Sequence, residues 1–89
     1  MISDSKFKIL KNILLKNFID TTVMIIVNGT IQTKMLITNS KITICKNKII
    51  ISNEEKDFTI DFIVMKKIIL DDEYRVKIIF EYFEIILEI

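Results

Sequence analysis

Histidine, proline, tryptophan and alanine are absent from this 89-residue chain, and glycine and cysteine occur once each. Without histidine the chain lacks the usual general base and the usual metal-binding imidazole. The single cysteine, Cys45, excludes an internal disulfide and a thiolate metal cage. The single glycine, Gly29, excludes a glycine-rich phosphate loop. We therefore expect a protein that is not an enzyme and that has no catalytic residue, no cofactor and no metal site.

Long hydrophobic runs are also missing. The longest uncharged stretch, Thr21 to Thr33, has thirteen residues and includes polar Asn28. It is too short and too polar to cross a bilayer. Lys6 and Lys8 precede an apolar stretch, as in a signal peptide, but Lys11 and Lys16 interrupt this stretch and no small-residue cleavage site follows it. The sequence therefore predicts a cytoplasmic protein that does not bind membranes, with its thiol reduced.

Charges of both signs are present, but they are unevenly distributed. The net charge is +1, yet residues 1–53 carry eight lysines against two aspartates, and residues 54–89 carry five basic against ten acidic residues. The first segment therefore has a net charge of +6 and the second −5. This asymmetry indicates either two binding faces of opposite charge or neutralisation between neighbouring strands.

Isoleucine dominates the composition, with 22 residues, and 51% of the chain is apolar. Abundant β-branched side chains and the lack of alanine favour sheet over helix. The one helical pattern spans residues 5–18, where Leu10, Leu14 and Phe18 fall on one stripe. We expect a single domain over residues 1–89, with this helix followed by antiparallel strands over about 22–89.

Turn signals divide the first strands. The predicted turns and the pairs that close them are Asn28-Gly29 (Val27 with Thr30), Asn39-Ser40 (Thr38 with Lys41), Lys46-Asn47 (Cys45 with Lys48) and residues 53–56 (Ser52 with Asp57). Asn28-Gly29 is a strong signal for a type I′ hairpin. With these registers the apolar residues gather on one face, which predicts a five-stranded meander.

The C-terminal third predicts a hairpin loop at Asp71-Asp72-Glu73 and a bulge or bend near Tyr82-Phe83, where the apolar phase changes. The expected fold is mainly β with one N-terminal helix (α+β), an antiparallel meander that curls into a small barrel or a two-layer sandwich. An apolar final strand would be an aggregation hazard if left open. We expect it to be an interface in a homodimer or higher oligomer, through Phe83, Ile85, Leu87 and Ile89.

Two charged surfaces are candidate binding faces. The candidate basic face consists of Lys34, Lys41, Lys48, Lys8, Lys11 and Lys16. The candidate acidic face consists of Asp71, Asp72, Glu73, Glu81, Glu84 and Glu88. The lysines could contact phosphates of a nucleic acid directly, and the carboxylates could stand in for phosphates in the channel of a nuclease. In both cases the alternative is a solvated surface that keeps the sheet soluble.

The segment from Phe18 to Leu36, a helix end that leads into "VMIIVNGTIQTKML", resembles the opening of Sm-like and Hfq-like ring proteins. In that family a short amphipathic helix also precedes a strand, an Asn-Gly turn and a second strand. The resemblance implies an RNA-binding homo-oligomer with Asn28 and Gly29 in the turn.

In its whole-chain style the sequence resembles the small inhibitors that phages and mobile elements use against bacterial immunity, of the anti-CRISPR type. The shared traits are short length, a composition typical of an A/T-rich genome, no catalytic residues and a polarised charge. The leading expectation is therefore a non-enzymatic protein-binding module that inhibits a host nucleic-acid-processing complex such as a CRISPR nuclease, with a larger protein or ribonucleoprotein as partner. The alternative is the Sm-like RNA-binding oligomer.

Overall fold

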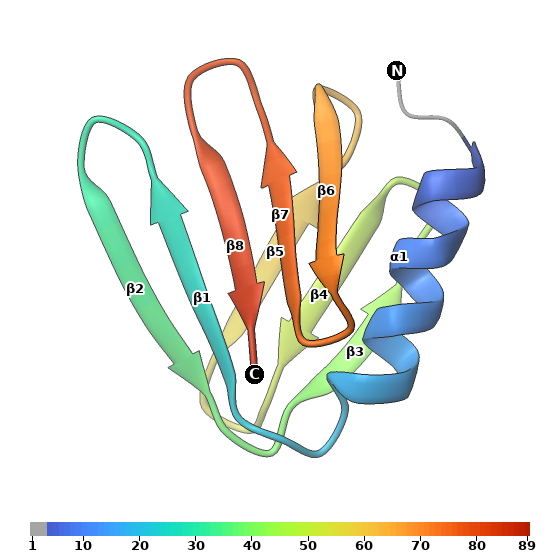
Figure 1. Cartoon of the computed structure of the whole chain (residues 1–89). Coiled ribbons are helices and arrows are strands. Elements are labelled where there is room, and N and C mark those ends of the chain that lie inside the picture. Colours follow the sequence, from blue (N-terminus) through green and yellow to red (C-terminus); the bar gives the residue numbers. More distant parts are fainter. Residues whose placement is uncertain (1–3) are drawn as a thin grey trace.

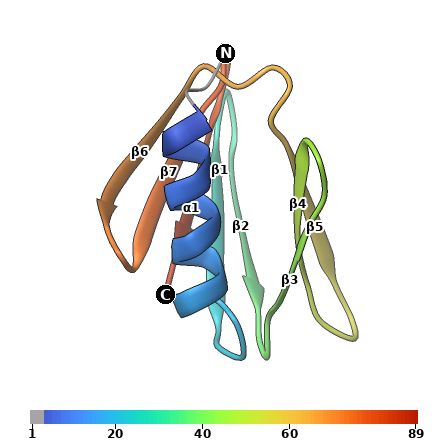
Figure 2. The same ribbon diagram turned by 90° about the vertical axis from the view of Figure 1, so that its right-hand side faces the viewer.

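Two antiparallel sheets lie face to face, with one helix along one side (Figures 1 and 2). The computed structural model describes residues 4–89. The elements in chain order are α1 (Asp4–Asn17), β1 (Val23–Asn28), β2 (Gln32–Ile37), β3 (Lys41–Ile44), β4 (Lys48–Ser52), β5 (Asp57–Asp61), β6 (Lys67–Asp72), β7 (Arg75–Ile79) and β8 (Glu84–Glu88). The predicted class, mainly β with an N-terminal helix, is confirmed. Of the two predicted architectures the barrel is wrong, because the sheets do not close on each other.

The strand order departs from the predicted meander. The five-stranded sheet has the order β2-β1-β8-β7-β6, and the three-stranded sheet has the order β3-β4-β5. Consecutive strands β2 and β3 therefore belong to different layers, and the last strand, β8, lies at the centre of the larger sheet. Only β3, β4 and β5 form the expected meander.

Two of the four predicted registers are confirmed, and both lie in the three-stranded sheet. Cys45 pairs with Lys48, where the Cys45 N–H donates to the Lys48 carbonyl at 2.8 Å. Ser52 pairs with Asp57. The apolar side chains of these three strands share the inner face of the sheet, where Ile49, Ile51 and Ile60 are fully buried. Because the loops are short, only one register places the polar residues of these strands on one face and the apolar residues on the other.

The predicted β1–β2 register is wrong. Val27 pairs with Thr33 rather than with Thr30, so the connection is longer than a two-residue turn. Gly29 has no positive φ, which excludes the type I′ turn. Its role is steric, because an added Cβ would lie 3.3 Å from the Cβ of Phe83. The shift reverses the facing of β1, so that Val23 and Ile25 enter the core.

The predicted Asn39-Ser40 hairpin is instead the crossing between the two layers. Asn39 has a φ of 50°, a left-handed conformation that asparagine tolerates well. Ser40 is fully buried, and its hydroxyl donates to the Phe18 carbonyl at 2.6 Å. Backbone bonds also run from Asp20 N–H to the Ser40 carbonyl (2.8 Å) and from Ser40 N–H to the Thr21 carbonyl (3.0 Å). The crossing is thus fastened to the end of α1.

The C-terminal hairpin is confirmed, but its loop is Glu73-Tyr74 rather than Asp71-Asp72-Glu73, because Asp71 and Asp72 belong to β6. Asp72 lies opposite Arg75, with a register shift between Leu70 and Asp72. The phase change near Tyr82-Phe83 is a tight turn rather than a bend in one long strand. Phe80 N–H donates to the Phe83 carbonyl at 2.9 Å, and the chain reverses to form β8.

This reversal corrects the predicted interface strand. Ile85 and Leu87 lie in the core of the single chain, on a strand that is paired on both sides. They are therefore unavailable to a second copy. Phe83 and Ile89, which flank the strand, remain partly exposed.

Helix α1 closes one side of the sandwich, next to the edge strands β3 and β6 (Figure 1). Leu10, Leu14 and Phe18 are fully buried, as their spacing predicts. Two polar side chains of α1 also reach the larger sheet. Lys6 Nζ donates to the Ile68 carbonyl at 3.0 Å, and Asn17 Nδ2 donates to the Glu73 carbonyl at 3.0 Å. The helix thereby covers the open edge of β6.

The opposite edge strand, β2, has its outward carbonyls occupied near its end. Lys56 Nζ donates to the Leu36 carbonyl at 3.1 Å, and Asn53 Nδ2 donates to the Thr38 carbonyl at 2.8 Å. Both side chains come from the β4–β5 loop of the other sheet. Such side chains obstruct the pairing of an edge strand with a second molecule.

Replacing Lys56 with methionine removes this obstruction but keeps the apolar stem. We expect Lys56→Met to self-associate through β2, with a several-fold increase in the dimer fraction measured by light scattering over a concentration series. The lost hydrogen bond should lower the free energy of unfolding by only about 1 kcal/mol. Lys46→Met, which removes an exposed turn lysine, is the matched control. Equal masses for the two variants at every concentration would show that Lys56 does not guard the edge.

Candidate functional site: an apolar opening between the sheets

Three turns lie together at one end of the molecule: the β1–β2, β5–β6 and β7–β8 connections (Figure 1). Their apolar side chains are unusually exposed. Tyr82 is 83% exposed and Ile31 78%, and the remaining members are Ile63, Val64 and Phe83. Gly29 of the first turn approaches both Tyr82 and Phe83 of the third. We call this set of five side chains the apolar end.

The β5–β6 connection shows why apolar residues are forced outward here. Phe62 and Met65 turn inward and are buried, which leaves Ile63 and Val64 between them in solvent. Asp61 Oδ1 accepts the Ile63 N–H at 3.0 Å, and Met65 N–H donates to the Phe62 carbonyl at 3.4 Å. These bonds hold the connection in a compact turn, so its exposed side chains are presented on a fixed backbone.

A cavity of about 320 Å³ opens beside the apolar end, between the two sheets. Its lining is mainly apolar and consists of Val27, Phe58, Thr59, Ile60, Asp61, Val64, Phe80, Phe83 and Ile85. Phe80 and Phe83 stack with their ring centroids 4.5 Å apart. Because aromatic stacking fixes the position of Phe83 at the rim, the cavity has a defined wall.

Burial decreases along β1 and β2 toward this opening. On β1 the inward residues change from fully buried Val23 and Ile25 to partly buried Val27. On β2 they change from fully buried Ile37 to an exposed Thr33. The cause is the mismatch of three strands against five. Helix α1 fills the extra width on the β6 side, whereas within residues 4–89 no element lies under the upper part of the β1–β2 hairpin (Figure 1).

The candidate basic residues do not form one surface. Lys34 pairs with Ile26 on the outer face of the five-stranded sheet, whereas Lys41 and Lys48 lie on the outer face of the three-stranded sheet. The prediction that these three lysines share one face is wrong, because the chain passes from one sheet to the other at Ser40. The remaining three lysines, Lys8, Lys11 and Lys16, lie on α1, with Lys11 Nζ 4.8 Å from the ring centroid of Phe7.

The candidate acidic residues are also dispersed, and most have cationic neighbours. The ion pairs are Arg75–Asp71 (2.9 Å), Arg75–Glu88 (3.1 Å), Lys77–Glu84 (3.4 Å) and Lys16–Glu73 (3.9 Å). The hydrogen bond that Arg75 donates to the Glu88 carboxylate raises the pKa of Arg75 above its ordinary value, so the guanidinium stays charged. Asp72 Oδ1 accepts the Tyr74 N–H at 2.7 Å, and Glu81 lies in the turn at the far end of β7. In strands β6 to β8 most of the acidic side chains are therefore neutralised by cations of neighbouring strands, which is the alternative predicted from the sequence.

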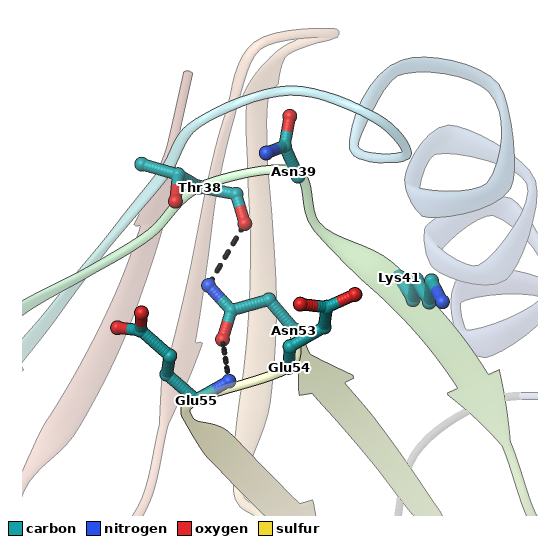
Figure 3. Close-up of a pocket in the computed structure, with 6 residues that line it drawn as sticks. All are labelled: Thr38, Asn39, Lys41, Asn53, Glu54 and Glu55. Carbon is teal, nitrogen blue, oxygen red and sulfur yellow. Dashed lines mark hydrogen bonds between the residues drawn. The ribbon is translucent and has the colours of Figure 1, made fainter.

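A polar pocket of about 210 Å³ lies at the opposite end and is lined by Thr38, Asn39, Lys41, Asn53, Glu54 and Glu55 (Figure 3). Asn53 is its organising residue. Its Oδ1 accepts the Glu55 and Lys56 N–H groups (2.9 and 2.8 Å), while its Nδ2 caps Thr38. These bonds serve the turn and the β2 edge. The part of the chain that the structure describes contains no group of three metal-ligating side chains.

The predicted register, with Ser52 opposite Asp57, also sets Lys48 opposite Asp61, and this pair is confirmed. Cys45 is exposed. The apolar end was missed. Its available signal is the run Phe62-Ile63-Val64-Met65, because four consecutive apolar residues cannot all face one side of a strand.

Fold and opening together define a small two-layer α+β protein with an apolar end and no gathered charged face. No family model, curated protein or solved structure matches the chain. Among residues 4–89 there is no helix with the length and apolar character needed to cross a membrane.

Proposed function

We propose that this chain is a non-enzymatic protein-binding module and that the apolar end is its binding surface. One observation carries the proposal: three connections at the same end of the molecule carry five exposed large apolar side chains. A clustered patch of this kind marks an interaction site more often than scattered surface residues do. Tyrosine and phenylalanine are also common anchors in interfaces, because they bury large area with few rotatable bonds.

For the biological setting, we propose a small cytoplasmic inhibitor of a larger nucleic-acid-processing complex, such as a CRISPR nuclease. The chain would dock on a protein subunit through the apolar end. Phosphate mimicry has less support, because four of the six candidate carboxylates lie beside a cation. An RNA-binding oligomer also has less support, since the lysines are divided among three surfaces.

The proposal is tested by removing apolar area from the apolar end without disturbing the core. Tyr82→Ser with Val64→Ser should reduce recovery of a stoichiometric protein partner at least tenfold in tagged purification from the cells that carry the chain. Leu15→Ser with Leu36→Ser is the matched control, because each of these leucines is 47% exposed and lies elsewhere. The control should retain the partner. Equal recovery with both double variants, or no partner with the unaltered chain, would contradict the proposal.

A further inference from the structure

Strand β5 has a free edge whose backbone groups have no partner. The bonds from Asn53 N–H to the Lys56 carbonyl (2.9 Å) and from Phe62 N–H to the Asn47 carbonyl (2.8 Å) bracket the β4–β5 pair. Because hydrogen-bonded pairs alternate in antiparallel sheets, Phe58 and Ile60 direct their backbone groups toward β4. Asp57, Thr59 and Asp61 direct theirs outward, and within residues 4–89 nothing binds them.

The other edges of the two sheets differ from β5. Lys56 from the opposite layer donates to the Leu36 carbonyl on β2, and Lys6 of α1 donates to the Ile68 carbonyl on β6. Strand β3 lies against α1. An edge strand without such protection is a ready template for another chain.

The β5 edge also borders the apolar cavity. Phe58 and Ile60 turn their side chains inward and line it from below, while Val27 and Phe83 line it from the larger sheet. A strand placed beside β5 would therefore extend the three-stranded sheet beneath the uncovered part of β1 and β2. Every second side chain of that strand would point into the cavity.

We infer that β5 accepts an extended segment of a partner protein as a fourth strand. This inference rests on the proposed function, since it names the kind of partner segment that binds at the same opening. Backbone hydrogen bonds to Asp57, Thr59 and Asp61 supply affinity, and the cavity selects apolar side chains at alternate positions.

Charge determines the intervening positions of the segment. Its outward side chains lie beside Asp57 and Asp61 on the outer face of the three-stranded sheet. Opposite charges across a strand pair are stabilising and like charges are destabilising. The fitting segment therefore alternates apolar residues with lysine or arginine.

A second copy of this chain does not fit the same edge. Antiparallel pairing of β5 with itself about Thr59 would place each Asp57 opposite the partner's Asp61. Registers shifted by one pair would place Asp57 or Asp61 opposite Thr59, and registers shifted by two pairs would place Asp57 opposite itself or Asp61 opposite itself. The central register and the two-pair shifts set carboxylates face to face, and the one-pair shifts set no cation opposite either aspartate, so the edge favours a different, basic partner.

The test uses three labelled synthetic peptides with the unaltered chain. In the first, valine and lysine alternate. The second has the same composition with all lysines at one end, and the third alternates valine with glutamate. Fluorescence anisotropy should show the first peptide binding about tenfold more tightly than either of the others, with amide chemical shifts moving at Asp57, Thr59 and Asp61. Equal binding of all three, or shifts confined to other strands, overturns the inference.

Thr59→Pro tests the backbone bond itself, because it removes an outward N–H and no bond to β4. Binding of the alternating peptide should fall about tenfold or more. The control Thr59→Val keeps the amide and should bind as the unaltered chain does.

A second variant covers the case in which Thr59→Pro does not fold. Asp57→Asn with Asp61→Asn should abolish the preference for lysine over glutamate, and each asparagine keeps an oxygen that can accept a hydrogen bond, as Asp61 does from Ile63. An unchanged preference overturns the inference. If the peptides fail but the apolar-end variants still lose their partner, the proposed function stands and strand addition is wrong.

Discussion

Phe18→Ala is expected to lower the free energy of unfolding by about 3–5 kcal/mol, the loss typical of a large buried aromatic. Phe18 is fully buried in the core beneath the end of α1. Its N–H donates to the Leu14 carbonyl, and its carbonyl accepts the Ser40 hydroxyl. Truncation leaves a cavity at the point where the helix, β1 and the crossing between layers meet. The free energy of unfolding of a small domain is about 5–15 kcal/mol in total, so much of the variant population should unfold near 37 °C.

Urea unfolding followed by circular dichroism measures this loss. Ile19→Ala is the control, because Ile19 is next to Phe18 in the sequence but its side chain is 37% exposed. Its truncation should lower the free energy of unfolding by well under half as much. A Phe18→Ala variant within about 1 kcal/mol of the unaltered chain would show that the core collapses around the vacancy. In that case α1 would not depend on Phe18 for its attachment.

Ser40→Ala is expected to lower the free energy of unfolding by about 1–3 kcal/mol, although it deletes a single oxygen. The hydroxyl donates to the Phe18 carbonyl at 2.6 Å and accepts the Thr21 N–H at 3.3 Å. Ser40 is fully buried, so these backbone groups lose a partner that water cannot readily replace.

Thr38→Ala serves as the control for Ser40→Ala, because Thr38 is an exposed hydroxyl residue two positions earlier. Its loss should be within about 0.5 kcal/mol. Equal unfolding midpoints for the two variants would mean that the Ser40 hydroxyl contributes nothing to the crossing. Combining Ser40→Ala with Phe18→Ala should give less than the sum of the two losses, because both act on one joint.

The three-stranded sheet was predictable because its information is local. Tight loops connect its strands, and polar residues alternate with apolar ones in β3 and β5, so a one-residue slip would expose the apolar residues of both strands. Cys45 opposite Lys48 and Ser52 opposite Asp57 follow from these two constraints alone.

The five-stranded sheet was not predictable in the same way. Strand β1 is apolar on both faces, because four apolar residues follow one another from Val23 to Ile26. The pattern therefore does not determine which face of β1 points into the core. The Asn39-Ser40 signal marks a reversal of the chain, but it does not say whether the flanking strands pair. Here the fully buried Ser40 and its bonds to the end of α1 direct β3 into the other layer.

Predicting the apolar end required the same missing information about strand pairing. Tyr82 and Phe83 share a segment with core residues, and the phase change there fits a bend as well as a reversal. Only the pairing of Ile79 with Glu84 makes it a turn, and only the tertiary fold places that turn next to Gly29 of the β1–β2 connection. Exposure at the apolar end is thus a property of the tertiary arrangement.

The position of β8 has a consequence for how this protein folds. Strand β8 lies between the β1–β2 and β6–β7 hairpins in the five-stranded sheet, and its pairing of Glu88 with Met24 joins residues separated by most of the chain. The β7–β8 pair also closes over a tight turn, whereas the pairing of β8 with β1 must overcome the entropy of a very long loop. Until that pairing forms, β1 and β8 each have an open side. The slow step of folding is therefore also the step at which the chain is most vulnerable to misassembly with its neighbours.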